Sequence, residues 1–458
     1  MGNRSTAEKF YNQALTALND KSSTVNVTTA YQLFASACHE DPTWHQGWFQ
    51  YGNNNGDLNH NQAAIASYRR ALFCEHTDEE RGKTLINLGW RLHQLGQLEE
   101  GEQCLLEAQK ILPNEPSVYL NLSQLVGLLG RSDESVIHAR TGFSLCSEPL
   151  YEACLAFSLL FNRKFAEGFK HFEIRFKWRL HAFLQYPYPK WEGEDDKILF
   201  LVSDQGLGDT LSFSRFMRRA AKKCKYIHAY VHAELLQLFM YSFSDISNIN
   251  LLPFGSMFPH ADCWSTFVSL PFALGLTDQE IRDQPHIHFP LIERPTMWMV
   301  SDIKLHIGVQ WRGSRLNDID THRSIQVQEF FELYRVPGIQ LYSLQVGEAS
   351  QEANAAGAVS LIKDLVPYIQ SDVIATLALM KNLDLIICCE SVVAHLAALY
   401  GKECWVLYSY QGRDYRIGLD GTDMIWTPKH RIFQQGPDRQ WGPVFKRVVD
   451  ALRERMGL

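Results

Sequence analysis

The stretch "LFLVSDQGLGDT", residues 199–210, changes character abruptly from apolar to polar. Its apolar start predicts a buried strand, and the glycine-containing part that follows predicts a turn into a helix. A strand that passes into a helix in this way is typical of a parallel α/β layer. Asp209 is then either the N-cap of a helix that begins at Thr210 or a carboxylate exposed for chemistry.

The alternation of strand and helix continues to the end of the chain. Apolar runs predict strands at 197–203, 226–232, 249–252, 304–311, 339–345, 383–389 and 404–408. Helices are expected at 210–223, 233–243, 327–336, 372–383, 392–401 and 441–456. Two successive layers predict two Rossmann-like domains that face a cleft, at 183–300 and 301–458, with a C-terminal helix that packs back across the joint.

Residues 1–182 follow a different period. The segment 86–114 aligns with 120–148 at a shift of 34, with small and large residues in matching places. Small residues let two helices approach, and large residues fill the groove of the next unit. The pattern resembles the tetratricopeptide repeat (TPR). This resemblance implies an α-solenoid whose groove binds a peptide or protein, or one that serves only as a homodimerisation or folding platform.

Composition excludes several classes of protein. A formal net charge of −7 argues against a nucleic-acid partner. The chain has no run of eighteen apolar residues and no apolar leader, so we expect a cytoplasmic protein without stable membrane insertion. The ten cysteines include no CxxC pair, which favours buried structural thiols over disulfides or a zinc site.

Ligands of parallel sheets bind beyond the carboxyl ends of the strands. Three polar segments are predicted there: 203–210, 311–324 and 388–395. None contains a G-x-G-x-x-G dinucleotide fingerprint or a G-x-x-x-x-G-K-[ST] phosphate loop. Enzymes that use nicotinamide cofactors or a P-loop are therefore not favoured.

The third segment, "CCESVVAH", places Ser391 at the start of a helix, where free N–H groups attract phosphate. His395 lies one turn further on the same face, and Glu390 is able to accept from ribose hydroxyls. The alternative is that Glu390 and Ser391 only cap the helix and that His395 is a buried structural histidine.

The second segment, "WRGSRLNDIDTHRS", is rich in basic residues: Arg312, Arg315, His322 and Arg323. It is either a solvated loop or a phosphate-binding loop, since arginine suits bidentate phosphate contacts. The pair Asp318 and Asp320 has the spacing of a metal-binding D-x-D, but its basic surroundings argue against a metal site.

Together the motifs "YPKWEGEDDKILFLVSDQGLGDTLSFSRF", "VSLPFALGL", "IGVQWRGS", "HRSI", "ESVVAHLAALYG" and "GRDYR" resemble those of bacterial TPR glycosyltransferases. The catalytic half of that family is similar to the heptosyltransferases and, more distantly, to protein O-GlcNAc transferase. The resemblance implies a GT-B fold and inverting, metal-independent transfer from a nucleotide-diphosphate sugar, with no cofactor.

The resemblance also implies roles for residues. Gly208 and Asp209 match the Gly-Asp whose aspartate is the proposed acceptor base, and Arg323 matches the basic residue that contacts phosphate. The nucleotide-sugar site would be formed by these and further residues: Gly206, Gly208, Trp311, Gly313, Ser314, Arg323, Glu390, Ser391, Val392 and His395. Glu390, Ser391 and Val392 stand where the family has Asp, Thr and Gly.

Three functions fit these features. The first is a hexosyl, heptosyl or N-acetylhexosaminyl transferase for protein glycosylation, in which the repeats present a protein acceptor. The second is a transferase directed at lipopolysaccharide or another glycan, with repeats used for assembly. The third is a non-catalytic TPR scaffold that keeps a degenerate GT-B domain.

Overall fold

The computed structural model describes most of the chain, namely residues 3–19, 25–177, 186–289, 299–313, 323–369, 372–410, 412, 414–417 and 423–458. The chain divides into two compact units, Met1–Asn162 and Arg163–Leu458. The first unit therefore ends at Asn162, whereas the sequence places the end of the helical domain at residue 182. The described part of the segment between these two positions, residues 163–177, groups with the α/β part.

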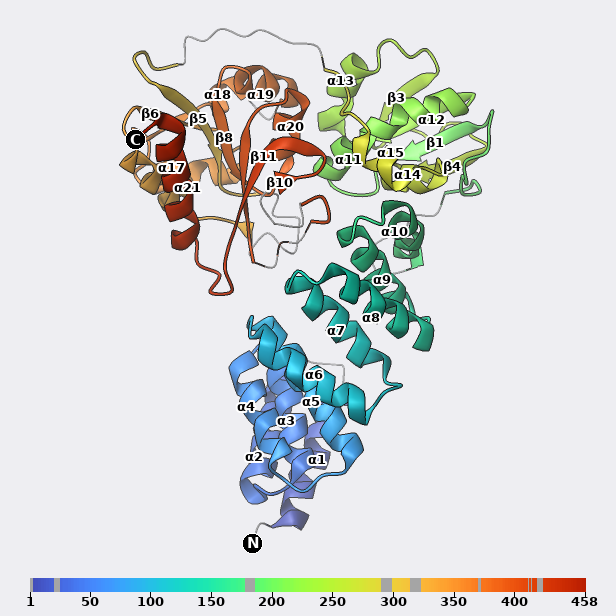
Figure 1. The fold of residues 1–458 in the computed structure, drawn as a ribbon, viewed down its shortest axis with the longest axis vertical. Helices are drawn as coiled ribbons and strands as arrows, with labels where there is room; N and C mark the ends of the chain where they lie inside the picture. Colours follow the sequence, from blue (N-terminus) through green and yellow to red (C-terminus); the bar gives the residue numbers. More distant parts are fainter. Residues whose placement is uncertain are drawn as a thin grey trace. The chain divides into compact units, whose positions relative to one another are not determined.

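The first unit is a helical repeat of the TPR kind, shown in blue to teal in Figure 1. Each odd-numbered helix from α1 to α7 pairs with the helix that follows it. The helices are α1 (Arg4–Asn19), α2 (Val25–Glu40), α3 (His45–Asp57), α4 (Asn61–Leu72), α5 (Asp78–Gln94), α6 (Leu98–Ile111), α7 (Pro116–Leu128), α8 (Ser132–Leu145) and α9 (Pro149–Phe161).

The predicted shift of 34 residues is confirmed, because α6 begins at Leu98 and α8 at Ser132. The close approach of paired helices at small residues is also confirmed. A Cβ on Gly89 of α5 would stand 3.0 Å from the carbonyl oxygen of Gly101 in α6 and 2.7 Å from Cγ of Leu105. The two backbones meet here because neither glycine carries a side chain.

The second unit begins with α10 (Phe165–Phe172) and the 3₁₀ helix η1 (Glu173–Lys177). Helix α10 packs against two short helices of the α/β part, α14 (Leu270–Ala273) and α15 (Asp278–Asp283). The backbone N–H of Ala166 donates to the Asp278 carboxylate at 2.7 Å. These contacts explain why the segment belongs to the second unit.

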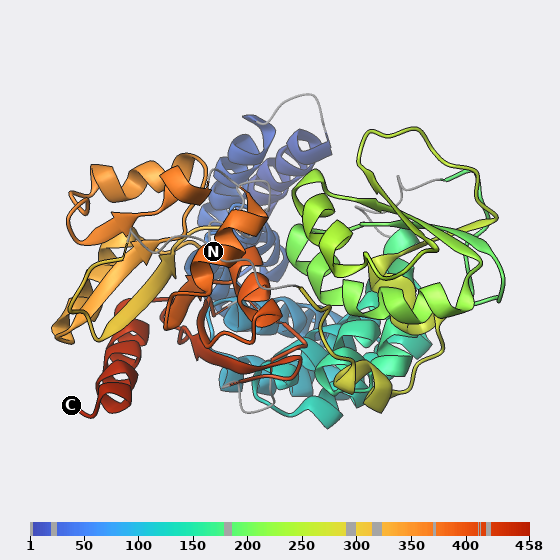
Figure 2. The same cartoon turned by 90° about the horizontal axis from the view of Figure 1, so that it is seen from above.

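Residues 186–289, which we call the first lobe, contain a four-stranded parallel sheet in the order β3-β2-β1-β4 (green in Figure 2). The strands are β1 (Ile198–Val202), β2 (Tyr226–Val231), β3 (Ile249–Pro253) and β4 (Cys263–Thr266). The connecting helices are α11 (Leu207–Phe213), η2 (Ser214–Phe216), α12 (Met217–Lys223), α13 (Ala233–Ser242) and η3 (Phe267–Ser269).

Residues 299–458, the second lobe, contain a separate seven-stranded sheet in the order β10-β11-β9-β8-β5-β6-β7 (gold to red in Figure 2). The strands are β5 (Leu305–Gln310), β6 (Ile339–Ser343), β7 (Ile362–Asp364), β8 (Leu385–Cys389), β9 (Cys404–Tyr408), β10 (Asp423–Met424) and β11 (Thr427–Gln434). Its helices are η4 (Val327–Arg335), η5 (Glu348–Ser350), α17 (Gln351–Ala355), α18 (Val366–Ile369), α19 (Val373–Met380), α20 (Val392–Leu399) and α21 (Gly442–Met456). All pairings are parallel except that of β10 with β11.

Three predicted elements differ from the structure. Residues 327–335 form a 3₁₀ helix instead of an α-helix, and their buried side chains recur every third residue at Val327, Phe330 and Leu333. Buried residues at every third position line up along one face of a helix only when each turn contains three residues, as in a 3₁₀ helix. The predicted helix 210–223 is divided by the 3₁₀ turn η2. Helix α21 packs on η4 and β11 of its own lobe rather than across the joint.

Within the described residues, no helix combines the length and the apolar character needed to cross a bilayer.

Candidate functional site

The connection between β1 and α11 carries the first group of predicted residues. Helix α11 starts at Leu207 with Gly206 as its N-cap residue, so Asp209 lies inside the first turn. The alternative that Asp209 is an N-cap is therefore wrong. Gly206 has φ −66°, and a Cβ there would meet nothing within 4 Å, so its backbone does not require glycine. Gly208 differs, because a Cβ there would stand 2.6 Å from the imidazole of His395.

Asp209 faces an arginine that the sequence did not predict as a site residue. Nη1 of Arg416 lies 3.4 Å from Oδ1 of Asp209, whose side chain keeps 31% of its surface exposed. Arg416 follows the carboxyl end of β9, and Asp209 follows that of β1. Burial raises the pKa of Asp209 above its ordinary value, and the charge of Arg416 opposes that rise.

Arg416 is held by a second carboxylate. Its Nε donates to the two oxygens of Asp414 at 2.7 and 2.8 Å, and Nη2 lies 2.5 Å from Oδ2. The backbone N–H of Arg416 also donates to Asp414, at 2.9 Å. Both side chains are buried. The guanidinium is therefore fixed in orientation, as multiple charge-assisted hydrogen bonds require.

Arg416 and His395 meet at one hydroxyl. Nη1 of Arg416 donates to Oγ of Ser212 at 3.0 Å, and the same oxygen lies 3.0 Å from Nδ1 of His395. Because a guanidinium only donates, the Ser212 proton is left to point at Nδ1. Burial, and then the charge of Arg416, lower the pKa of His395 well below its ordinary value. His395 is thus a neutral residue that joins α20 of the second lobe to α11 of the first.

Glu390 and Ser391 lie between β8 and α20, as predicted. Ser391 is the N-cap residue of α20, and Val392 is the first helical residue. The Ser391 hydroxyl donates to Oε1 of Gln310 and makes no capping hydrogen bond, so the alternative in which this side chain only caps the helix is wrong. The N-terminal N–H groups of α20 keep their capacity to bind an anion.

Glu390 has an unusual protonation equilibrium. Burial raises its pKa to about 7, and Asp414 adds to the rise, while Arg416 and Arg323 oppose it. Glu390 is therefore close to half protonated at neutral pH. A group in this state can donate a hydrogen bond as well as accept one.

The loop after β5 places its predicted residues in different roles. Trp311 has no exposed surface and belongs to the core of the second lobe, with its indole N–H donated to Glu352 at 3.0 Å. It therefore positions the loop and does not itself reach a ligand in this arrangement. The guanidinium of Arg323 covers Gly313, where a Cβ would stand 2.4 Å from Nη2. Ser314, Arg315, Asp318, Asp320 and His322 lie outside the described residues.

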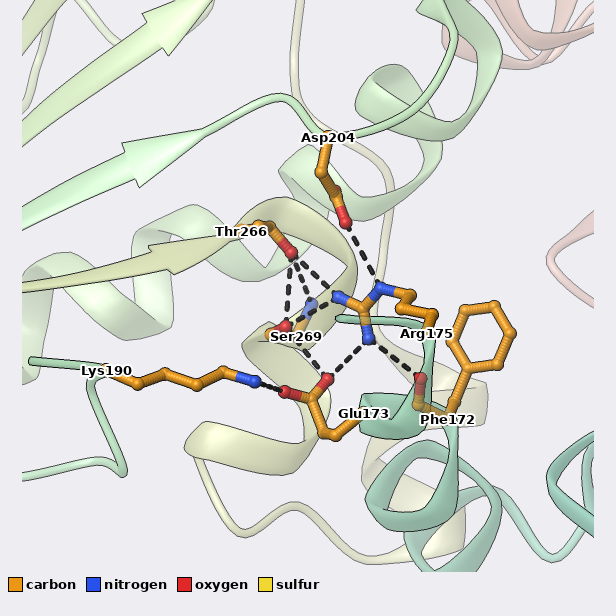
Figure 3. Close-up of polar contacts among 7 residues, drawn as sticks. All are labelled: Phe172, Glu173, Arg175, Lys190, Asp204, Thr266 and Ser269. Atoms are coloured by element: carbon orange, nitrogen blue, oxygen red, sulfur yellow. Dashed lines mark hydrogen bonds and ion pairs between the residues drawn. The ribbon is translucent and has the colours of Figure 1, made fainter. Parts of the chain in front are cut away.

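A second polar cluster, missed by the sequence reasoning, lies under the start of the same β1–α11 connection (Figure 3). Arg175 of η1 is 4% exposed. Its donors reach Oδ2 of Asp204 at 3.2 Å, the carbonyl of Phe172 at 3.2 Å, Glu173 at 2.5 Å, Thr266 at 2.9 Å and Ser269 at 2.7 Å. All five N–H groups of the guanidinium therefore have an acceptor.

Glu173 completes this cluster. It accepts from Lys190 and, at 2.9 Å, from the Ser269 hydroxyl. Thr266 ends β4 and Asp204 follows β1, so Arg175 joins the carboxyl ends of two neighbouring strands. Because no donor of Arg175 is left over, its role is to hold the connection in place rather than to bind a ligand.

Among the described residues, no three His, Cys, Asp or Glu side chains are grouped so as to hold a metal ion.

Comparisons with known proteins found no matching family model and no matching curated protein. Among solved structures, a MamA fragment from Desulfovibrio magneticus RS-1 matches with 14% identity over 37% of this chain and 93% of its own. PilF of Pseudomonas aeruginosa matches with 19% identity over 37% of this chain and 75% of its own. A thermophilic TPR protein from Thermus thermophilus matches with 15% identity over 37% of this chain and 90% of its own. Each TM-score is 0.32, so the repeat assignment depends on the helix pairing and not on these likenesses.

Proposed function

We propose that the chain is an inverting glycosyltransferase of the GT-B kind that moves a sugar from a nucleotide-diphosphate donor to an acceptor hydroxyl. The observation that carries the proposal is the pairing of Asp209, at the carboxyl edge of the first sheet, with Arg416, at the carboxyl edge of the second. Ligands of parallel sheets bind at these edges. A donor bound on one lobe and an acceptor on the other would meet there.

In this proposal the acceptor oxygen attacks the anomeric carbon and its proton passes to Asp209. The bond between that carbon and the phosphate oxygen breaks, and its electron pair leaves with the nucleoside diphosphate. A carboxylate with a raised pKa suits the base, because its affinity for the proton is higher. The product is a glycoside of inverted configuration.

The leaving diphosphate needs fixed positive charge. Arg323 and the N-terminus of α20 follow the carboxyl ends of β5 and β8, which are neighbouring strands. Arg323, whose guanidinium lies against Gly313, would supply positive charge, and α20 would supply its N-terminal N–H groups, so the proposed reaction needs no metal for charge stabilisation. Glu390, at the same edge, is suited to a hydrogen bond with a hydroxyl of the donor.

The test is nucleoside-diphosphate release from a panel of nucleotide sugars. We expect one donor class to be turned over and Asp209→Asn to reduce the rate by about 10² to 10⁴. Asp245→Asn, an exposed acid of the same lobe, is the matched control. Release from no donor by the unmodified protein would exclude a transferase and leave the scaffold function.

A protein acceptor is the second part of the proposal, because peptide-binding arrays are built from such repeats. Removing Met1–Asn162 should abolish transfer to a protein acceptor while donor hydrolysis continues. Transfer that survives the deletion would favour a glycan or lipopolysaccharide acceptor, with the repeats used for assembly.

A further inference from the structure

The Arg416 guanidinium is shared unequally between two carboxylates. Asp414 binds it through Nε, at 2.7 and 2.8 Å, and through Nη2, at 2.5 Å. Asp209 meets it through Nη1 alone, with 3.4 Å between Nη1 and Oδ1. Hydrogen bonds between charged groups have lengths of about 2.7–2.9 Å, so the contact with Asp209 is an ion pair without a full hydrogen bond. The strong contacts of Arg416 are therefore those with Asp414.

The remaining nitrogen of Arg416 faces the first lobe. Nη1 carries two protons, and the acceptors near it are Oγ of Ser212, at 3.0 Å, and Oδ1 of Asp209. Within the described ranges this is the one ion pair or hydrogen bond of the Asp209 side chain, which keeps 31% of its surface exposed. Its second oxygen, Oδ2, therefore has lone pairs available to an incoming hydroxyl, as a base requires.

The backbone on both sides of Arg416 is held by contacts that do not involve Asp414. The N–H of Ile425 donates to the carbonyl of Arg416 at 2.8 Å. Ile417 forms an antiparallel bridge with Met424. The path of the chain is therefore fixed by these contacts, and the charge of Asp414 determines the direction of the guanidinium.

The two carboxylates compete for one guanidinium. Arg416 carries a single positive charge, and both Asp209 and Asp414 lie against it. An arginine that has one carboxylate in reach tends to bind it through two nitrogens. Without the charge of Asp414, we expect Arg416 to turn toward Asp209 and to occupy both of its oxygens. A carboxylate bound in this way is a poorer base, because its lone pairs are already engaged.

We infer that Asp414 is a positioning residue for Asp209: it holds the Arg416 guanidinium by Nε and Nη2, so that Asp209 keeps one oxygen for the acceptor hydroxyl. The inference rests on the proposed function for the meaning of that hydroxyl, but it predicts a property of Asp209 that is measurable without substrate. Asp414 touches no substrate in this scheme and acts through Arg416.

The ionisation of Asp209 reports on this arrangement. The charged and titratable groups that face it come from both lobes: Asp204 of the first lobe and Glu390, Asp414, Tyr415 and Arg416 of the second. Burial raises the pKa of Asp209, the charge of Arg416 lowers it, and the charges of Asp414 and Asp204 raise it. Asp414→Asn should therefore lower this pKa in two ways, by removing a negative charge and by letting Arg416 approach. Only the second effect requires Arg416.

The experiment titrates the full chain, without substrate, after its aspartate side-chain carboxyl groups are labelled with ¹³C. The NMR resonance of Asp209 is identified by its loss in Asp209→Asn. Asp414→Asn keeps the oxygen that accepts from the backbone N–H of Arg416 at 2.9 Å and replaces the oxygen that faces Nη2 by an amide. We expect the titration midpoint of Asp209 to move to lower pH in this variant. Asp245→Asn, which breaks an exposed pair with Arg218, is the matched control and should leave the midpoint unchanged.

A double-mutant cycle separates the two effects. The same comparison is made in a chain that carries Arg416→Gln, where no guanidinium can turn toward Asp209. We expect Asp414→Asn to lower the midpoint less in that background than in the unmodified protein. Equal shifts in the two backgrounds would mean that Asp414 acts by its charge alone and would overturn the inference. A midpoint that stays in place or rises while Arg416 is present would overturn it too.

Asp414→Glu decides the question where Arg416→Gln does not fold or leaves Asp414 protonated, which the same spectra show. This variant keeps both charges and displaces the carboxylate by one methylene group. An action by charge alone predicts an unchanged midpoint for Asp209, and that result would overturn the inference. A changed midpoint is the expected result.

Turnover connects the inference to the proposed function. Nucleoside-diphosphate release by Asp414→Asn should be about 10²-fold slower than by the unmodified protein, as expected when a reacting group is misplaced. If the Asp209 midpoint moves as expected but the unmodified protein turns over no donor, Asp414 stands as the residue that orients Arg416 and the transferase function fails. If Asp414→Asn and the unmodified protein turn over a donor equally fast, the transferase stands and the positioning inference fails.

Discussion

The backbone of Gly208 lies directly against the imidazole of His395. A Cβ on Gly208 would stand 2.6 Å from Cδ2 and 2.7 Å from Nε2 of that ring. The ring has little freedom to move away, because its Nδ1 contacts Oγ of Ser212. The contact joins α11 to α20 and so determines how closely the two lobes approach at the proposed site.

Gly208→Ala should therefore separate the two helices. We expect the unfolding free energy to fall by about 1–3 kcal/mol, as for other overpacked sites, and turnover of the donor to fall with it. Denaturant unfolding and nucleoside-diphosphate release measure the two effects. Gly206→Ala is the matched control, since its Cβ has open space, and a loss as large as that of Gly208→Ala would contradict the explanation.

Arg175→Met should be strongly destabilising, because it leaves the Asp204 carboxylate, whose side chain has no exposed surface, without its arginine partner. The expected cost is about 3–5 kcal/mol. Arg175→Lys keeps the charge but not the five donors, so its unfolding free energy should lie between that of Arg175→Met and that of the unmodified protein. Urea unfolding is the measurement. Arg219→Met, which breaks an exposed pair with Glu280, should change little, and equal losses would refute the structural role.

Glu390→Gln should change the pH dependence of stability. The folded-state pKa of about 7 lies above the ordinary 4.5, so the folded chain binds the extra proton between these values. Glu390 therefore favours folding most below its ordinary pKa, and this contribution is lost as the pH rises through about 7. Relative to the unmodified protein, Glu390→Gln should gain stability between about pH 5 and pH 8. A difference that does not vary with pH would show that the pKa is unperturbed.

His430→Leu should show the opposite pH dependence, with its gain in stability growing as the pH falls. His430 is buried in β11, and neither ring nitrogen has a hydrogen-bond partner within the described ranges. Burial lowers its pKa to about 4, so the unfolded chain binds more protons between that value and the ordinary 6.5. The cost of burying His430 to the free energy of folding therefore grows as the pH falls below about 6.5, and a leucine at this position removes that cost.

Thermal unfolding of His430→Leu at several pH values measures this effect. The gain in stability of His430→Leu over the unmodified protein should be largest at acidic pH. His306→Leu serves as the control, because its Nδ1 contacts the Tyr342 hydroxyl at 2.8 Å. A gain for His430→Leu that is the same at every pH would reflect packing alone.

The sequence predicts the elements whose pattern is local. Strand β1 and strand β8 are apolar throughout, and their burial follows from that. Strand β4 was missed, because its four residues include a serine and a threonine whose burial depends on neighbouring parts of the fold. The 3₁₀ form of η4 was missed because a short amphipathic stretch satisfies helices of either period.

The candidate site was only partly predictable for the same reason. Asp209, Glu390 and His395 were found because each follows a recognisable strand. Arg416 was not, although it lies in the quoted motif "GRDYR", because its contact with Ser212 joins residues 204 positions apart. Arg175 was missed because a buried arginine is expected only where acceptors converge on it, and here they come from the ends of β1 and β4.

The contacts of α10 and η1 determine where foreign repeats can be grafted onto this chain. Arg175 lies after the first compact unit but before the first strand, and it braces Asp204 next to the connection that carries Asp209. A chimera that exchanges helical repeats should therefore be joined near Asn162, so that α10 and η1 stay with the sheets they brace. A junction at residue 182 would replace Arg175 with a residue of the other protein. The chimera would then lose the contact between Arg175 and Asp204 as well as the original repeats.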